Sequence, residues 1–195
     1  MAMNEISEYV DSSGILLVSA TREVGIPKFA VYNFIKENRF ERVGCGIYAS
    51  PDAWADENYI LSLRCPQAVF SHDEALFHYG LVDHEPQKPT ITIYSGYGTG
   101  RLNKDGVGVF TVKRELLEIG KTEVSTAMGH RIPMYNPERT ICDLVRSRSN
   151  FEIQDFQTAL KTYIAKKDKD LRLLMQYAAL FHVDNLIRKY MEVML

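Results

Sequence analysis

Hydrophobic residues recur with helical spacing in the stretch 25–40, GIPKFAVYNFIKENRF. Val31, Phe34 and Ile35 stand at positions i, i+3 and i+4, which places them on one side of a helix. Pro27 suits the first turn of that helix, where its missing N–H costs no hydrogen bond. The pattern therefore predicts an amphipathic helix from about Pro27. Its opposite side would carry Lys28, Tyr32, Asn33 and Lys36.

The flanking segments predict a compact N-terminal motif. A short helix before Gly14 and a second helix capped by Ser19 precede a turn at Gly25, and the segment 40–50 (FERVGCGIYAS) reads as two strands around a glycine-rich turn. The positions expected to be buried around the turn are Leu17, Ala20, Val24, Ile26, Val31 and Phe34. Two helices joined by a turn and followed by a hairpin are typical of a winged helix-turn-helix.

The rest of the chain alternates helical and extended segments. We expect helices at YILSLRC, HDEALFHYG and PERTICDLVRS, strands at AVF and PTITIYS, a hairpin at TAMGHRIPMYN, and helices from Phe151 to the end. Ser71 is expected to cap the second of these helices, and residues 96–106 to form a glycine-rich hairpin connection. The predicted fold class is α+β, with a winged helix-turn-helix domain at 1–56 and a mixed α/β domain at 57–195 that ends in helices.

Composition restricts the possible functions. The chain has 195 residues, 46% hydrophobic and 25% charged, which is a globular composition, and no apolar run approaches the roughly 20 residues of a membrane span. The first residues lack the features of a signal peptide, and three scattered cysteines indicate free thiols, so we expect a cytoplasmic protein. Residues 1–56 hold five basic and eight acidic side chains, a net charge of −3, so DNA contact would depend on local charge placement.

The polar side of the 28–36 helix is the candidate DNA-reading surface. Asn33 would read adenine, Tyr32 would contact a thymine methyl group or a phosphate, and Lys28 and Lys36 would reach guanine or the backbone. Arg42 on the hairpin would touch a phosphate or the minor groove, and Arg22 and Arg39, which flank the helix, would bind phosphate. The alternative is a protein-interaction module with ordinary solvated charges.

A second basic stretch lies near the C-terminus. It contains Lys161, Lys166, Lys167, Lys169 and Arg172. These residues would extend the contact to DNA phosphates or meet an RNA or acidic partner, and the alternative is a solvated helix face.

Signatures of enzymatic chemistry are weak. Gly96, Gly98 and Gly100 suggest a phosphate loop, but the expected turn and strand after them lack the helix N-terminus that such a loop requires. His72, His78 and His84 are spaced by six, which puts them on different sides of a helix. A search for clustered acids, a glycine-flanked serine or the HExxH pattern gives no candidate for nuclease or hydrolase chemistry. His130 has no evident partner in sequence. We expect no enzyme, no metal and no cofactor, with Arg139 and Asp143 forming a surface or half-buried ion pair.

The order of these segments resembles the AbiEi-like antitoxins of type IV toxin–antitoxin systems, which act in abortive infection and phage resistance. The matching blocks are REVGIPKFAVYNFIKENRFERVGCGIYAS, FSHDEALFHYGL, PTITIY and NPERTICDLV, which cover about residues 15–150. The resemblance implies autorepression through inverted repeats in the promoter, with two copies on the DNA, and antitoxin activity in the second domain. The implied functional partner is a nucleotidyltransferase-like toxin, antagonised without a stable complex.

Two other functions stay open from the sequence. One is a metabolite-responsive winged-helix regulator whose second domain binds a small ligand, which a thermal-shift screen would reveal. The other is a nuclease of the restriction type, which cleavage of DNA in the presence of magnesium would reveal. The preferred interpretation is a non-enzymatic repressor and antitoxin.

Overall fold

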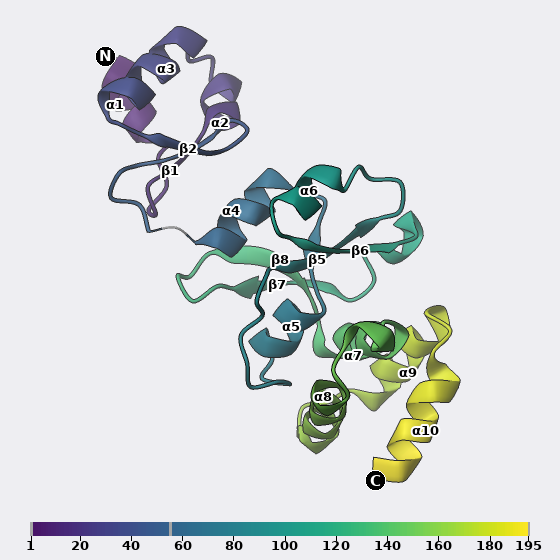
Figure 1. Ribbon diagram of the computed structural model, residues 1–195. Coiled ribbons are helices and arrows are strands. Elements are labelled where there is room, and N and C mark those ends of the chain that lie inside the picture. Colours follow the sequence, from purple (N-terminus) through teal and green to yellow (C-terminus); the bar gives the residue numbers. More distant parts are fainter. Residues whose placement is uncertain (1, 55, 195) are drawn as a thin grey trace. The chain divides into compact units, whose positions relative to one another are not determined.

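The computed structural model describes residues 2–54 and 56–194 and has an α+β fold with two separate sheets (Figure 1). The chain divides into two compact units, described separately here. The first unit comprises residues 1–66 and 126–130, and the second comprises residues 67–125 and 131–195. The expected domains were 1–56 and 57–195, whereas this division by contacts places residues 57–66 in the first unit.

The first unit contains four helices and a three-stranded sheet among its described residues. Its elements are α1 (Ala2–Ser7), β1 (Ile15–Leu17), α2 (Val18–Glu23), α3 (Lys28–Glu37), β2 (Glu41–Gly44), β3 (Ile47–Ala49) and α4 (Glu57–Arg64). β3 lies in the centre and pairs antiparallel with β1 and with β2. The predicted helix–turn–helix–hairpin order is present, and β1 is an additional strand.

The core of this unit lies between α1, α3 and β1. Val31, Phe34 and Ile35 from α3 are buried against Ile6 and Leu16, as the periodicity of α3 predicts. The predicted role of Ser19 is wrong: α2 begins at Val18 after Leu17, which makes no side-chain cap. Val24 is also misassigned, because it is exposed.

Thr21 occupies the buried position of α2 instead. It is fully buried, and its hydroxyl donates to the carbonyl of Val18 at 2.9 Å. Such a bond satisfies the hydroxyl within the helix, so a threonine can occupy this buried position.

Helix α4 belongs to the first unit because its apolar side packs there. Ile60 joins Ile15 and Ile47 in a small core, and Tyr59 donates its hydroxyl to Asp11 at 3.1 Å. The carboxylate of Asp56 caps α4 by accepting from the Tyr59 N–H at 3.0 Å. These long-range contacts explain the displaced boundary, since the polar segment before α4 alone suggests a linker.

The second unit is built on a mixed five-stranded sheet. Its elements are β4 (Val69–Phe70), α5 (Asp73–His78), β5 (Thr90–Tyr94), α6 (Gly100–Lys104), β6 (Gly108–Val112), β7 (Lys121–Ser125), β8 (Arg131–Tyr135), α7 (Pro137–Arg146), α8 (Ile153–Ala165), α9 (Leu171–Leu180), α10 (Asp184–Met194) and the 3₁₀ helices Arg114–Leu116 and Arg148–Asn150. The strand order is β6-β5-β4-β8-β7. The hairpin predicted within residues 126–136 is confirmed only in part: this stretch contains the turn and β8, and the first strand, β7, precedes it.

The glycine-rich segment 96–106 is not the hairpin connection that the sequence predicts. β5 and β6 run parallel, with Ile91 opposite Val109, and the glycine-rich connection contains the short helix α6. Parallel neighbours require a crossover, and α6 provides it. Gly96 and Gly98 precede the five-residue helix α6, and Gly100 is its first residue, where a turn was expected. The expected lack of a helix was the ground for rejecting a phosphate loop, so that ground is also wrong.

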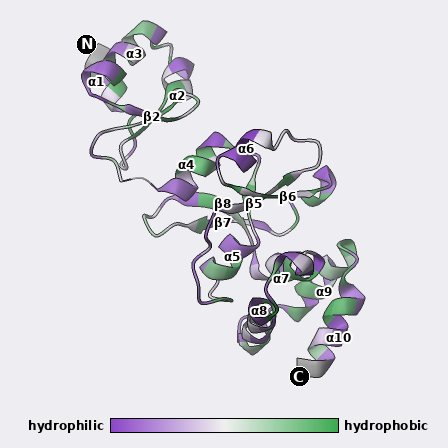
Figure 2. Ribbon diagram, in the orientation of Figure 1, coloured by the Kyte–Doolittle hydropathy of each residue, from purple (hydrophilic) through white to green (hydrophobic). Residues whose placement is uncertain are grey.

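Helices α7 to α10 and α5 share the largest hydrophobic core of the chain. Ile141, Leu144 and Phe156 are buried within it, and the helices α8 to α10 carry both hydrophobic and hydrophilic residues, as expected of helices that pack by one side (Figure 2). Asn136 caps α7 by accepting from the Arg139 N–H at 3.0 Å, and Pro137 follows in the first turn, as predicted.

Arg139 and Asp143 of α7 form a fully buried ion pair, so the expected surface or half-buried position is wrong. Arg139 Nε lies 3.0 Å from Asp143 Oδ2, with the side chains 0% and 1% exposed. The guanidinium lies between the rings of Tyr135 and Phe181, 4.0 and 3.9 Å from their centroids. Gly120 (φ +76°) passes so close that a Cβ there would lie 2.5 Å from Arg139 Cβ.

The junction between β4 and α5 places a histidine in an uncommon conformation. His72, at φ 54° and ψ −124°, precedes α5, and Ser71 makes no cap, contrary to expectation. The fully buried imidazole stacks on Phe110, and Nδ1 and Nε2 lie 2.9 Å from Ser71 Oγ and 3.2 Å from Ser147 Oγ. Burial lowers the pKa of His72 well below its usual value, and the positive charges of Arg146 and Arg139 lower it further.

We expect acidification to destabilise the fold through His72. The unfolded chain takes up a proton near the ordinary histidine pKa of about 6.5, whereas the folded chain holds this imidazole neutral. The free energy of unfolding should therefore fall below about pH 6.5 by up to about 1.4 kcal/mol per pH unit. Urea denaturation at pH 7.5 and 5.5 measures the change.

His72→Asn should reduce this pH dependence, because asparagine tolerates positive φ and does not titrate. His84→Asn is the matched control, since His84 is exposed in the second unit. An unchanged pH dependence in His72→Asn would exclude His72 as its source.

None of the helices among residues 2–54 and 56–194 has the length and apolar character needed to cross a bilayer.

Candidate nucleic-acid interface

The solvent-facing side of α3 is polar, aromatic and positively charged. Lys28, Tyr32, Asn33 and Lys36 are all exposed, as the sequence predicts, and α3 would be about 15 Å long from its ten residues. The side chain of Phe29 lies on the same side and is 72% exposed. The buried side chains of α3 fix this orientation, because they anchor the helix to the core of the first unit.

The connection between α2 and α3 is short and glycine-dependent. Gly25 has φ +81°, which a residue with a Cβ rarely adopts, and the N–H of Ile26 donates to the carbonyl of Thr21 at 3.1 Å. The tight turn brings Arg22 at the end of α2 close to Lys28 in the first turn of α3, and both side chains line one cleft.

A cleft of about 770 Å³ opens between α2, α3 and the β2–β3 hairpin. It is lined by Val18, Thr21, Arg22, Ile26, Lys28, Val31, Tyr32, Arg42, Cys45, Gly46 and Tyr48. Three of these side chains are basic and none is acidic. The cleft therefore concentrates positive charge locally, although residues 1–56 carry net negative charge.

The aromatic residues of the cleft hold part of this arrangement together. The rings of Tyr32 and Tyr48 meet edge to face with centroids 6.2 Å apart, and Lys28 Nζ lies 5.7 Å from the centre of the Tyr32 ring. Burial and the hydrogen bond with Tyr32 raise the pKa of Tyr48, so its hydroxyl stays neutral and can donate a hydrogen bond. Arg42 Nε donates to the Gly44 carbonyl at 3.1 Å, next to the bulge in β2.

The seven residues predicted to contact DNA are all exposed, but they do not form one cluster. Arg22, Lys28, Tyr32 and Arg42 line the cleft. Asn33 and Lys36 lie on the outer side of α3 and do not line it, and Arg39 follows α3 at φ 54°.

Sequence reasoning missed Phe29 and Tyr48. Phe29 lies seven positions before Lys36, so both are on the same side of α3 and outside its apolar stripe. This position alone could have identified Phe29 as a residue of the exposed side. The contact between Tyr48 and Tyr32 depends on how the hairpin folds back, which no local pattern contains.

The basic stretch near the C-terminus surrounds the junction of α8 and α9. Lys161, Lys167 and Arg172 are exposed, and Lys166 and Lys169 are half-buried. Lys169 Nζ donates to the Lys166 carbonyl at 2.9 Å, which ties it to the chain. Two of the five basic side chains are therefore less available to a partner than the sequence suggests.

The histidines show no metal-binding arrangement in the part of the chain that the structure describes. There, no group of three histidine, cysteine, aspartate or glutamate side chains is positioned to hold a metal ion. His72 is buried, whereas His78 and His84 are exposed. His130 has close partners in the first unit, although the sequence suggested none.

Comparison with known proteins supports the fold class without indicating a family. No family model and no curated protein matches the chain. The chain is an α+β protein with two sheets, and it is structurally similar to one solved protein. This is the Rv2827c protein from Mycobacterium tuberculosis, with a TM-score of 0.63 and 15% sequence identity, covering 91% of this chain and 71% of that chain.

Proposed function

We propose that this chain is a transcriptional repressor that binds duplex DNA through a winged helix-turn-helix made of α2, α3 and the β2–β3 hairpin. The observation that carries the proposal is the cleft in which Arg22, Lys28 and Arg42 meet beside the exposed side of α3. DNA phosphates favour such a concentration of positive charge, and the major groove, about 12 Å wide, admits one helix.

The exposed side chains divide into two roles in this proposal. Asn33 reads an adenine edge, Phe29 and Tyr32 contact thymine methyl groups or sugar–phosphate, and Lys36 contacts guanine or the backbone. Arg22, Lys28, Arg39 and Arg42 bind phosphates and fix the orientation of α3. The basic residues of the α8–α9 junction would add phosphate contacts of the same kind.

We also propose that the chain is the antitoxin of a type IV toxin–antitoxin system, as its resemblance to the AbiEi-like antitoxins implies. In this proposal the DNA-binding unit represses its own operon from the cytoplasm, with two copies on an inverted repeat. The second domain antagonises a nucleotidyltransferase-like toxin without a stable complex.

Binding to the DNA upstream of its own gene tests the repressor function. We expect fluorescence anisotropy to give an affinity at least about 10³-fold higher for this DNA than for a shuffled sequence of equal length. The logarithm of the affinity should fall linearly with the logarithm of salt concentration, by about 0.9 for each phosphate contacted. Equal affinity for both sequences would contradict the proposal.

Co-expression with the product of the neighbouring gene tests the antitoxin function separately. We expect growth to be restored by the full chain and by a variant that no longer binds DNA. Growth arrest with both would contradict the antitoxin proposal and leave the repressor proposal intact.

A further inference from the structure

A serine, a histidine and an aspartate of the first unit form a connected hydrogen-bond chain. His130 Nδ1 lies 2.6 Å from Asp56 Oδ2, and His130 Nε2 is hydrogen-bonded to Ser13 Oγ. This is the connectivity of a serine nucleophile, an imidazole base and an orienting carboxylate. The three residues are distant in sequence, so nothing in a local motif predicts them.

The carboxylate of this chain is held in its ionised form. Burial alone would raise the pKa of Asp56, but hydrogen bonds from the Thr126 hydroxyl, His130 and the Tyr59 N–H together lower it. The Thr126 bond is 2.5 Å long, and the Tyr59 bond is 3.0 Å long. An ionised Asp56 favours a proton on Nδ1 of His130, which leaves Nε2 free to accept the proton of Ser13.

The imidazole is fixed in position from a second direction. The ring of Tyr59 stacks on His130 with centroids 4.0 Å apart and planes 4° apart, and the histidine side chain is 12% exposed. The backbone N–H of His130 also donates to Thr126 Oγ1 at 3.2 Å, which ties the main chain that carries the ring to the same group. A general base requires such restraint, because its nitrogen must stay aligned with the hydroxyl that it deprotonates.

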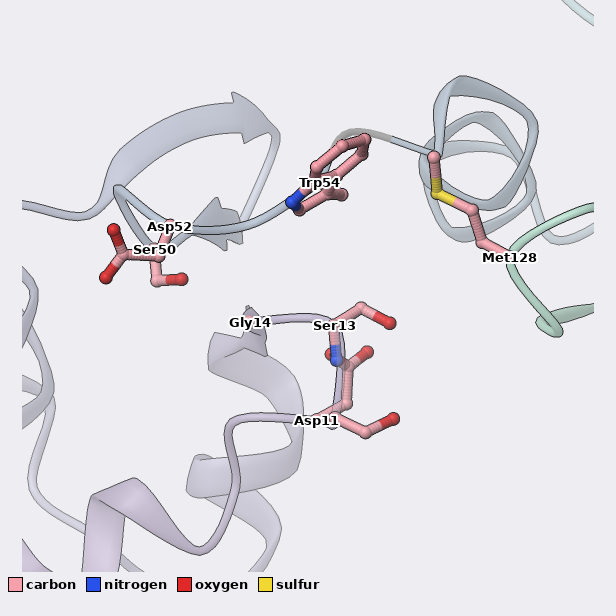
Figure 3. A pocket seen from close by; sticks show the side chains of 8 residues that line it. Asp11, Ser13, Gly14, Ser50, Asp52, Trp54 and Met128 are labelled. Carbon is pink, nitrogen blue, oxygen red and sulfur yellow. The ribbon is translucent and has the colours of Figure 1, made fainter.

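Ser13 opens into a pocket of about 530 Å³ (Figure 3). Trp54 and Met128 lie across the opening from Ser13 and Gly14, and both are exposed apolar side chains, 79% and 48% accessible. Exposed apolar side chains beside a polar nucleophile provide a surface for the hydrocarbon part of a small ligand. Asp52 and Ser50 complete the polar side of the pocket.

We propose that Ser13 is an activated nucleophile that accepts a short apolar acyl group from an activated ester. Ser13 Oγ forms a bond to the acyl carbon while the bond from that carbon to the ester oxygen breaks. The Ser13 proton passes to His130 Nε2 and then to the departing oxygen, which leaves as an alcohol. Water repeats the sequence on the acyl-serine, releasing the carboxylic acid and restoring Ser13. This site is independent of the proposed DNA interface.

The turn around Ser13 restricts the rate of this reaction. The N–H groups of Ser13 and Ile15 donate to Asp11 Oδ1, and that of Gly14 donates to the Asp11 carbonyl. These three donors are therefore unavailable to a developing oxyanion, and each such donor is worth about 10²–10³ in rate. We expect slow turnover, so that the acylated serine accumulates and can be isolated.

Covalent labelling of the full chain tests the proposal. With p-nitrophenyl acetate, we expect a release of p-nitrophenolate that approaches one equivalent per chain, and mass spectrometry should place the acetyl group on Ser13. A fluorophosphonate probe should modify the same residue. Ser13→Ala should abolish both labels, and Ser19→Ala is the matched control, because Ser19 is an exposed serine of the first unit that does not line this pocket.

The partners of Ser13 provide the second arm of the test. Asp56→Asn keeps an oxygen to cap α4, and His130→Asn keeps a polar side chain, so thermal unfolding can verify that each variant is folded. Both should slow Ser13 labelling by at least about 10²-fold, the contribution expected of a general base. Labels confined to lysines or Ser12, or a Ser13 rate unchanged in both folded variants, would overturn the proposal.

Discussion

The triple variant Lys28→Ala, Lys36→Ala, Arg42→Ala should lose binding to the promoter DNA by more than about 10³-fold. Hydrogen bonds to charged groups contribute about 1.5–3 kcal/mol each, so three lost contacts amount to about 4–9 kcal/mol. All three side chains are exposed and lie away from the core, so the fold should be unaffected. Anisotropy titrations at several salt concentrations should also show a slope lower by about three units.

A second triple variant separates local charge placement from overall charge. Arg101→Ala, Lys104→Ala, Lys113→Ala removes the same number of positive charges from exposed positions of the second unit. We expect this control to retain promoter affinity within about threefold, because none of the three residues belongs to the proposed interface and salt screens the contribution of overall charge. Equal losses in both triple variants would show that the α3 surface has no specific role.

The sequence predicts helix α3 and its exposed side well because both depend on local periodicity. The spacing of Val31, Phe34 and Ile35 determines which side is buried, and the buried set in the structure agrees. The cleft is different. Its basic residues come from α2, α3 and the β2–β3 hairpin. They lie close together because of the turn at Gly25 and because the hairpin packs beside the two helices.

Apart from the helix caps assigned to Ser19 and Ser71 and the burial expected of Val24, the errors concern residues whose partners are far away in sequence. The sequence identifies Arg139 and Asp143 as an i, i+4 pair but contains no sign that Phe181 covers them. His130 lacks a nearby partner in sequence, yet Asp56 lies 74 positions before it. Parallel pairing of β5 and β6 likewise depends on the short helix α6. The sequence does not predict α6, because the glycines around it favour a turn. Local patterns specify elements, and only the folded chain specifies these contacts.

Replacement of Arg139 by methionine should destabilise the chain by about 3–5 kcal/mol, because the buried Asp143 loses its fully buried partner and keeps only the partly exposed Arg146, whose Nη2 lies 3.1 Å from Asp143 Oδ1. Arg139 Nη1 donates to the carbonyls of Leu116 and Ile119 at 2.9 and 2.7 Å, and these would also lose a donor. Burial raises the pKa of Asp143, and the charges of Arg139 and Arg146 counteract this shift. Urea denaturation at pH 7.5 would measure the loss against Arg101→Met, an exposed control.

The double variant Arg139→Met, Asp143→Leu tests whether the loss comes from the buried Asp143 carboxylate, which Arg139→Met leaves paired with Arg146 alone. Apolar side chains in place of both ions remove the desolvation penalty along with the attraction, so the double variant should be more stable than Arg139→Met alone. The unpaired carbonyls of Leu116 and Ile119 would keep it less stable than the native chain by about 1–3 kcal/mol. If the double variant were less stable than Arg139→Met, the Asp143 carboxylate without Arg139 would not be the source of the loss. The Tyr135 and Phe181 contacts of the guanidinium would then be the main contribution of Arg139 to the core of the second unit.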